Sequence, residues 1–242
     1  MESAIEIRNL KKSFGSHEVL KSINLKVARG ENLVVLGKSG TGKSVIIKCI
    51  VKLIVPDAGE IFVLGQNMGQ LEESALLDAR KKVGFLFQSG ALYDSMSVRE
   101  NLEFPLRKAA KKRSRQETDA LVVGALESVD LQSSIDKMPS ELSGGMRKRL
   151  GLARTLILKP EIMLYDEPTT GLDPITAKEI SQLILTVQTE RKTTAIIITH
   201  DLVCAKMTAN RIVVIKEGEF AAEGSYDELQ KSEDPWVRSF FG

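Results

Sequence analysis

The octapeptide Gly37-Lys38-Ser39-Gly40-Thr41-Gly42-Lys43-Ser44 most narrowly limits what this chain can fold into, because it matches the pattern G-x-x-x-x-G-K-[ST] between two regular segments. Residues 32–36 are an apolar run that predicts a buried strand, and residues 45–54 carry apolar side chains at helical spacing. At such a strand-to-helix turn, glycines allow inward-facing N–H groups, which make a concave site for the α- and β-phosphates of a nucleotide. We expect Lys43 to reach the β- and γ-phosphates and the Ser44 hydroxyl to bind Mg²⁺. The alternative is a glycine-rich turn that a lysine happens to follow, and it leaves both flanking segments unexplained.

The composition is that of a soluble globular protein. With 242 residues, of which 43% are hydrophobic and 27% charged, the chain is long enough for a full α/β core, as one domain with an insertion or as two domains. A formal net charge of +2 is too small to indicate nucleic acid as a partner. Cys49 and Cys204 lie in separate apolar stretches, which favours reduced core residues over a disulfide. The sequence shows neither a signal-peptide pattern nor an apolar run of membrane-spanning length, so we expect a chain that is not secreted and does not span a membrane by itself.

The N-terminal segment predicts an antiparallel β-layer. Residues 4–8 and 17–27 alternate apolar and polar side chains, as half-buried strands do. Phe14 falls between them, on the predicted loop, where an exposed ring can stack on an adenine. A core phenylalanine beneath the turn accounts for the same sequence equally well.

Polar side chains follow three apolar segments farther along the chain. Gln88 follows residues 83–87, where its amide can reach a bound metal or the attacking water; simple solvation of the strand end is the alternative. His200 follows residues 193–198, and we expect it to hydrogen-bond a γ-phosphate. Its place beside other strand ends favours this role over that of a structural histidine.

The third polar strand end is Asp166-Glu167, which follows the apolar residues 161–165. Paired carboxylates at the end of a buried strand are costly unless a cation or a substrate uses them. We therefore expect Asp166 to bind Mg²⁺, either as a direct ligand or through a hydrogen bond to one of the direct ligands. Glu167 is suited to orienting and activating a water molecule against the γ-phosphate.

Residues 91–158 are more helical and more polar than the rest, which indicates an inserted helical subdomain. Its predicted helices are residues 98–104, 114–129 and 143–158. Ser143 is a good N-cap for the last helix, and Gly144 and Gly145 leave N–H groups open to an anion. The sequence thus predicts a second phosphate site, although it contains one phosphate loop.

In this order the motifs resemble those of the ATP-binding-cassette family over essentially the whole chain. They are residues 37–44, Gln88, 142–146, 162–167, 171–173 and His200. The resemblance implies an α/β fold, namely a P-loop NTPase cassette with a RecA-like parallel-sheet core, an antiparallel β-layer and an inserted α-helical subdomain. Residues 1–88 and 159–242 would form the core and the β-layer, and residues 89–158 the helical subdomain. Mg²⁺-dependent ATP hydrolysis is the implied activity.

The same resemblance implies a head-to-tail homodimer that binds two ATP molecules. Ser143, Gly144, Gly145 and Asp173 of one copy would contact the ATP that Lys43 of the other copy holds, which explains the second phosphate site. Phe14 would be the aromatic residue that stacks on adenine, where many members carry tyrosine. Met146 replaces the glutamine common in this motif, which leaves the backbone donors intact.

A narrower resemblance is to the ATPases of Mla-type lipid transporters, which are Mce-associated and also described as toluene-tolerance proteins. It rests on residues 87–93, 101–107, 138–146 and 173–176. It implies phospholipid transport with a separate integral-membrane permease, Mce-type lipid-binding and accessory subunits, and a location at the cytoplasmic face of the inner membrane. Leu92, Tyr93 and Met96 would form a groove for a permease helix. Some relatives carry a longer C-terminal tail that embraces the partner subunit, whereas this chain stops at Gly242.

Two other functions are compatible with the same ATPase motifs. One is the ATPase subunit of an importer for a polar solute. The other is a soluble ATPase outside transport, which would show long heptad stretches or two cassettes in one chain.

Overall fold

Six strands form the central sheet, in the order β10-β9-β3-β8-β7-β6. The structure is a computed structural model that describes residues 2–109 and 113–241. Strands β9, β3, β8, β7 and β6 run parallel to one another, and β10 is antiparallel to β9. Parallel strands with both faces covered have near-continuous apolar sequences, which is the pattern seen here. The strands are β3 (Asn32–Leu36), β6 (Val83–Leu86), β7 (Ile162–Asp166), β8 (Thr194–Thr199), β9 (Arg211–Lys216) and β10 (Glu219–Gly224).

A second, antiparallel sheet has the order β2-β1-β4-β5 and confirms the predicted β-layer. Its strands are β1 (Ser3–Phe14), β2 (His17–Ala28), β4 (Ala58–Val63) and β5 (Gln66–Asn67). Phe14 was expected on the loop, but it is the last residue of β1 and pairs with His17 of β2. The hairpin ladder extends past several register shifts to the turn itself, so the strand is longer than its alternating sequence indicates.

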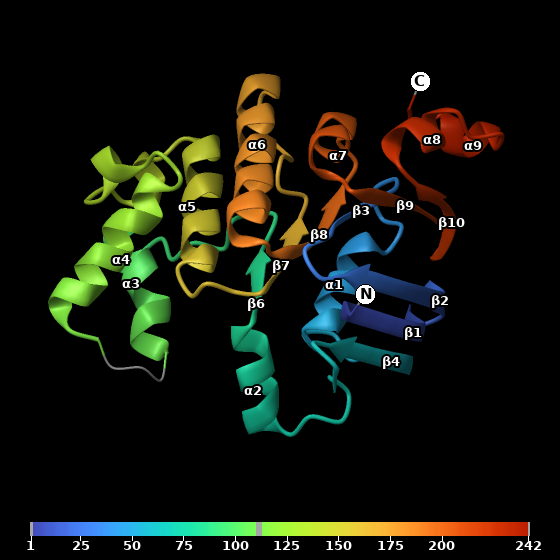
Figure 1. The fold of residues 1–242 in the computed structure, drawn as a ribbon, viewed down its shortest axis with the longest axis horizontal. Helices are drawn as coiled ribbons and strands as arrows, with labels where there is room; N and C mark the ends of the chain where they lie inside the picture. The colour runs from blue at the N-terminus through green and yellow to red at the C-terminus, as the bar shows by residue number, and fades with distance from the viewer. Residues whose placement is uncertain (1, 110–112, 242) are drawn as a thin grey trace.

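Helices cover both faces of the central sheet (Figure 1). On one face, α1 (Lys43–Ile50) lies between the two sheets, and its apolar residues join the core that the β-layer shares. On the other face lie α6 (Pro174–Arg191) and α7 (Leu202–Thr208). The remaining helices of the core region are α2 (Glu73–Lys81), α8 (Tyr226–Gln230) and α9 (Pro235–Arg238). The sequence did not predict α7 and α9, because elements of seven and four residues are too short to show a helical period.

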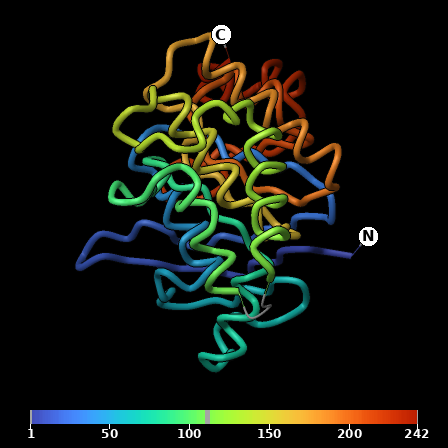
Figure 2. Tube along the Cα trace, turned by 90° about the vertical axis from the view of Figure 1, so that its left-hand side faces the viewer, coloured from blue at the N-terminus to red at the C-terminus, as the bar shows by residue number. Residues whose placement is uncertain are grey.

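Three helices form the predicted helical region, whose path is traced in Figure 2. Their buried apolar side chains form a core of their own. The three helices are α3 (Val98–Lys108), α4 (Arg115–Glu127) and α5 (Gly144–Leu156), with short 3₁₀ turns at Gln132–Ser134 and Pro139–Glu141. Helix α3 was expected to end at residue 104, but it continues through Pro105 because Leu106 packs in this core. The boundary of the helical subdomain at residues 89–158 stays a proposal, and residues 110–112 within it lie outside the described residues.

These layers confirm the predicted α/β class. They also place the carboxyl ends of β3, β6, β7 and β8 along one edge of the central sheet, since these strands are parallel neighbours. The segments that leave this edge are the phosphate loop, Gln88, Glu167 and His200.

Asn101 fixes the loop between β6 and α3. Its side chain is fully buried, and its Oδ1 accepts a hydrogen bond of 2.9 Å from the Tyr93 N–H. Its Nδ2 donates to the carbonyls of Tyr93, Met96 and Ser97 at 3.0–3.1 Å. One amide therefore satisfies four backbone groups in a loop without regular structure.

We expect Asn101→Ala to lower the free energy of unfolding by about 2–4 kcal/mol, because a fully buried side chain would be lost together with its hydrogen bonds to the Tyr93 N–H and the Met96 carbonyl. Urea denaturation followed by circular dichroism measures the change. Gln116→Ala, on the exposed face of α4, is the control and should change stability by less than about 0.5 kcal/mol. An unchanged denaturation midpoint for Asn101→Ala would show that the loop does not depend on this side chain.

Candidate functional site

A cavity of about 420 Å³ lies at the carboxyl edge of the central sheet. It brings together residues from the β-layer, the phosphate loop, and the segments after β6, β7 and β8. The lining residues are His17, Val19, Ser39, Gly40, Gly42, Lys43, Ser44, Val45, Gln88, Glu167, Thr170 and His200. Five of the predicted phosphate-loop residues and the strand-end residues Gln88, Glu167 and His200 thus line one cavity.

Gly42 determines how the phosphate loop enters α1. It is the N-cap of that helix with φ 94°, a left-handed conformation that favours glycine. A Cβ at this position would also lie 2.9 Å from the side chains of Val19 and Leu20. The chain therefore turns at Gly42 directly beneath the β-layer, and the N-terminus of α1 begins at Lys43 beside the cavity.

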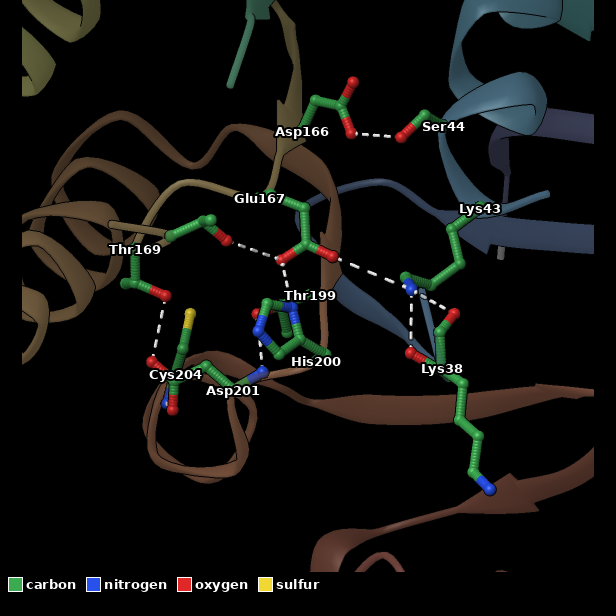
Figure 3. Close-up of polar contacts among 12 residues, drawn as sticks. Lys38, Lys43, Ser44, Asp166, Glu167, Thr169, Thr199, His200, Asp201 and Cys204 are labelled. Atoms are coloured by element: carbon green, nitrogen blue, oxygen red, sulfur yellow. Dashed lines mark hydrogen bonds and ion pairs between the residues drawn. The ribbon is translucent and has the colours of Figure 1, made fainter. Parts of the chain in front are cut away.

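Lys43 is the buried cation of the loop, with 5% of its side chain exposed. Its Nζ donates to the carbonyls of Gly37 at 2.7 Å and Lys38 at 2.9 Å, and it lies 3.6 Å from Glu167 Oε1 (Figure 3). Burial lowers the pKa of the Lys43 ammonium, and the Glu167 carboxylate works against that shift. A buried ammonium held mainly by neutral carbonyls is well suited to an incoming anion. The Lys38 side chain, by contrast, is exposed and points away from the cavity (Figure 3).

Ser44 and Asp166 place two oxygen ligands side by side. Asp166 is the last residue of β7 and is 5% exposed, and its Oδ1 accepts a hydrogen bond of 2.5 Å from the Ser44 hydroxyl. Mg²⁺ prefers few protein oxygens together with phosphate oxygens and water. A carboxylate and a hydroxyl at the end of a phosphate loop fit that preference.

Glu167 lies between Lys43 and His200 (Figure 3). Its Oε2 accepts a 3.1 Å hydrogen bond from the Thr170 hydroxyl and lies 2.8 Å from His200 Nδ1. Its backbone has φ 49°, an uncommon conformation for a residue with a side chain. Its N–H donates to the Ile198 carbonyl at 2.9 Å, and its own carbonyl accepts a 3.2 Å hydrogen bond from Lys148 Nζ. With the Lys43 contact included, five residues therefore contact Glu167.

The segments after β7 and β8 are also tied to each other. Asp201 caps α7, and its Oδ2 accepts a 2.9 Å hydrogen bond from the Thr169 hydroxyl. The Asp201 N–H donates to the Thr199 hydroxyl at 3.0 Å. These bonds fix His200 beside Glu167, although the His200 side chain is 52% exposed.

The other predicted site residues do not line this cavity. Among the described residues that do, none belongs to the following predicted set: Phe14, Gly37, Lys38, Thr41, Ser143, Gly144, Gly145, Asp166 and Asp173. Phe14 is 50% exposed at the hairpin tip, next to His17, which does line the cavity. Within one chain, Phe14, the residue predicted to stack on adenine, is thus next to a residue of the cavity. The second predicted phosphate site, at Ser143, Gly144 and Gly145, is separate from the cavity.

That second site consists of two exposed helix starts. Ser143 caps α5 by accepting a bond from the Met146 N–H at 3.2 Å, and Asp173 caps α6 through the N–H groups of Ile175 and Thr176. The Thr176 hydroxyl and these N–H groups lower the pKa of the Asp173 carboxyl. A Cβ on Gly145 would lie 2.4 Å from Thr176 Cγ2, so any larger residue there would have to displace the Thr176 side chain from its place between these two helix starts.

Two contacts to Glu167 were missed from the sequence, those of Thr170 and Lys148. Thr170 lies in the turn after the strand, where sequence does not reveal which way a hydroxyl points. The signal for Lys148 was present, because it precedes the buried Leu152 and Leu156 by four and eight residues on the same helix. It was hidden within the basic triplet of residues 147–149, which is typical of a solvated helix face.

The fold and the cavity define a P-loop nucleotide-binding protein, and comparisons with known proteins identify its class. The family model described as ABC transporter matches residues 20–170. The Mycobacterium leprae probable ribonucleotide transport ATP-binding protein mkl is 39% identical, over 99% of this chain and 69% of its own length. The Haemophilus influenzae intermembrane phospholipid transport system ATP-binding protein MlaF is 36% identical, over 99% of this chain and 90% of its own length.

A solved structure gives the same result. The dimeric post-hydrolysis state of the ATP-binding cassette MJ0796, bound to ADP and Pi, has a TM-score of 0.84 and 31% identity, and covers 91% of this chain and 98% of its own. The chain belongs to the ABC transporter family, and the cassette it forms is that family's ATP-binding and ATP-hydrolysing subunit. The resemblance inferred from the motifs is confirmed, including the similarity to MlaF.

We expect Lys43→Ala to weaken ATP binding at least tenfold, or about 1.4 kcal/mol, because the buried cation that faces the cavity is removed. Titration with a fluorescent ATP analogue measures the change. Lys48→Ala is the matched control, since Lys48 lies in the last turn of the same helix and does not line the cavity. Equal affinities for the wild type and Lys43→Ala would remove the assignment of the phosphate loop.

Proposed function

We propose that this chain is the Mg²⁺-dependent ATPase subunit of a Mla-type transporter that moves phospholipid or a related lipid between membranes. The observation that carries the ATPase part is the position of Glu167, held between Lys43 and His200 and beside the Ser44–Asp166 pair. The lipid part is supported by the similarity to MlaF over nearly the whole chain.

The proposed reaction assigns distinct roles to residues in and beside the cavity. The N–H groups of residues 37–44 and the Lys43 ammonium bind the phosphates of ATP. Ser44 and Asp166, with Gln88 nearby, would hold Mg²⁺, which would neutralise charge on the β- and γ-phosphate oxygens. Glu167 accepts a proton from the attacking water through a carboxylate oxygen. The water oxygen bonds to the γ-phosphorus while His200 donates a hydrogen bond to a γ-phosphate oxygen. The bond between the γ-phosphorus and the β–γ bridging oxygen breaks, which releases ADP and inorganic phosphate.

A head-to-tail homodimer would complete this site. Ser143 and Asp173 cap exposed helix starts that do not line the chain's own cavity. In the dimer, Ser143, Gly144, Gly145 and Asp173 of one copy would meet the ATP held by the other copy, whose adenine would stack on Phe14. The dimeric state of the similar cassette MJ0796 supports this arrangement.

We expect Glu167→Gln to bind ATP normally while its hydrolysis rate falls about 10²- to 10⁴-fold, because the positioned base is lost. With ATP bound and not consumed, the variant should remain dimeric in light scattering, whereas the wild type returns to monomer as ATP is used. The variant without nucleotide is the control. A variant that stays monomeric with ATP and Mg²⁺ would contradict the ATP-driven dimer.

The proposed assembly adds a permease and Mce-type lipid-binding and accessory subunits at the cytoplasmic face of the inner membrane. In the part of the chain that the structure describes, none of the helices is long and apolar enough to cross a membrane. Tyr93 is 42% exposed, and its ring packs against that of Phe104 at a tilt of 50°, with 4.7 Å between ring centroids, so the loop before α3 presents an aromatic surface. We propose that a permease helix docks there. The name of the mkl relative favours a polar solute as the alternative cargo.

Cells in which this gene carries Lys43→Ala should accumulate mislocalised phospholipid in the outer envelope and become sensitive to detergent, because transport loses its energy source. Lipid analysis of isolated membranes measures the first effect. Uptake of sugars, amino acids and nucleosides is the control and should stay normal. Intact lipid distribution with loss of uptake of one polar nutrient would favour the importer alternative and leave the ATPase mechanism in place.

A further inference from the structure

Lys148 is a buried cation outside the residues so far given a role. It lies on α5, five residues after the Ser143 cap, and only 6% of it is exposed. Its Nζ donates to the backbone carbonyl of Glu167 at 3.2 Å and to the backbone carbonyl of Gln88. A side chain of the helical region thus binds the backbone at the ends of both β6 and β7.

The Glu167 backbone needs such a partner. A non-glycine residue with φ 49° is strained and keeps this conformation only when its surroundings determine it. The Glu167 N–H donates to the Ile198 carbonyl of β8, and its carbonyl accepts hydrogen bonds from the Thr170 N–H at 3.3 Å and from Lys148 at 3.2 Å. Lys148 is thus the contact that ties this carbonyl to the helical region, and together these bonds fix the direction in which the carboxylate leaves the backbone.

The charge of Lys148 supports the same role. Burial lowers the pKa of its ammonium, and the nearby Glu167 and Asp166 carboxylates work against that shift. The cation approaches Glu167 from the backbone side, whereas Lys43 approaches its carboxylate from the cavity side. Lys148 does not line the cavity, so it can act on the reaction through Glu167 and Gln88 without touching ATP.

We propose that Lys148 is a positioning residue for ATP hydrolysis, which holds Glu167 in its left-handed conformation and ties it, together with Gln88, to α5. The inference rests on the proposed role of Glu167 as the base. It predicts that loss of Lys148 lowers the rate of the chemical step and leaves ATP binding intact.

The test compares the purified full-length chain with Lys148→Met, which keeps the length of the stem and removes the ammonium. We expect kcat to fall about 10- to 100-fold through misplacement of the base, while KM and the Kd for ATP stay close to the wild-type values. Lys148→Arg, which restores a cation with several donors, should recover most of kcat.

Arg154→Met is the matched control. Arg154 is a second, partly buried cation of α5, and it donates to the carbonyls of Gly90 and Ala91 in the same loop but not to Glu167. We expect it to lower kcat far less than Lys148→Met. If Lys148→Met fails to fold, Lys148→Gln keeps a neutral NH₂ donor group on a shorter side chain and should show an intermediate loss of kcat.

The outcomes separate this inference from the proposed function. A wild-type kcat in a folded Lys148→Met or Lys148→Gln chain would overturn the role of Lys148. A fall in kcat together with an equally large fall in ATP affinity would overturn it as well. Glu167→Gln is measured alongside. If Glu167→Gln still hydrolyses ATP at the wild-type rate, the proposed role of Glu167 as the base is wrong. If Glu167→Gln is inactive while Lys148→Met is fully active, only the inference about Lys148 is wrong.

Discussion

Charge balance at one edge of a parallel sheet is the constraint on which the rest of this structure depends. Lys43, Lys148, Asp166 and Glu167 all lie there with less than a tenth of their surface exposed. Burying any one of them alone would be costly, and together their charges cancel. The edge is therefore stable before substrate arrives. In the proposed reaction, the negative charge of ATP would be met by Lys43, the backbone N–H groups of the phosphate loop, the start of α1 and a divalent cation held by the Ser44–Asp166 pair.

The same edge shows how far sequence could predict this protein. Residues 32–36, 161–165 and 193–198 are apolar runs that end in polar residues, and parallel strands bring such ends together. This was enough to predict the α/β class and the convergence of Lys43, Gln88, Glu167 and His200, which the structure confirms as neighbours of one cavity. The chemical roles of these residues stay predictions.

What sequence could not predict depends on contacts between distant segments. The position of Phe14 at the end of β1 follows from how far the hairpin ladder extends, which alternation in either strand does not reveal. The positive φ of Glu167 has no local signature, because bonds from residues 19 positions upstream and 31 positions downstream hold it. Lys148 belongs to a basic triplet, and only the depth at which α5 packs against the sheet distinguishes it from its solvated neighbours.

Helix α5 connects three surfaces that the proposed function requires to act together. Its exposed start at Ser143 would meet the ATP of the other copy, its Lys148 holds Glu167 and Gln88, and its Arg154 holds the loop that leads to Tyr93. Closely packed interiors shift as units and do not deform gradually, so a displacement of Ser143 would be passed along the helix to both loops. In the proposed dimer, binding of ATP between the copies would therefore position Glu167 and, in the same step, move the loop around Tyr93 on which the permease helix is proposed to dock. Hydrolysis would then require the two copies to close on ATP. Lys148, which holds Glu167, lies on α5, and α5 is the helix that this closure would move.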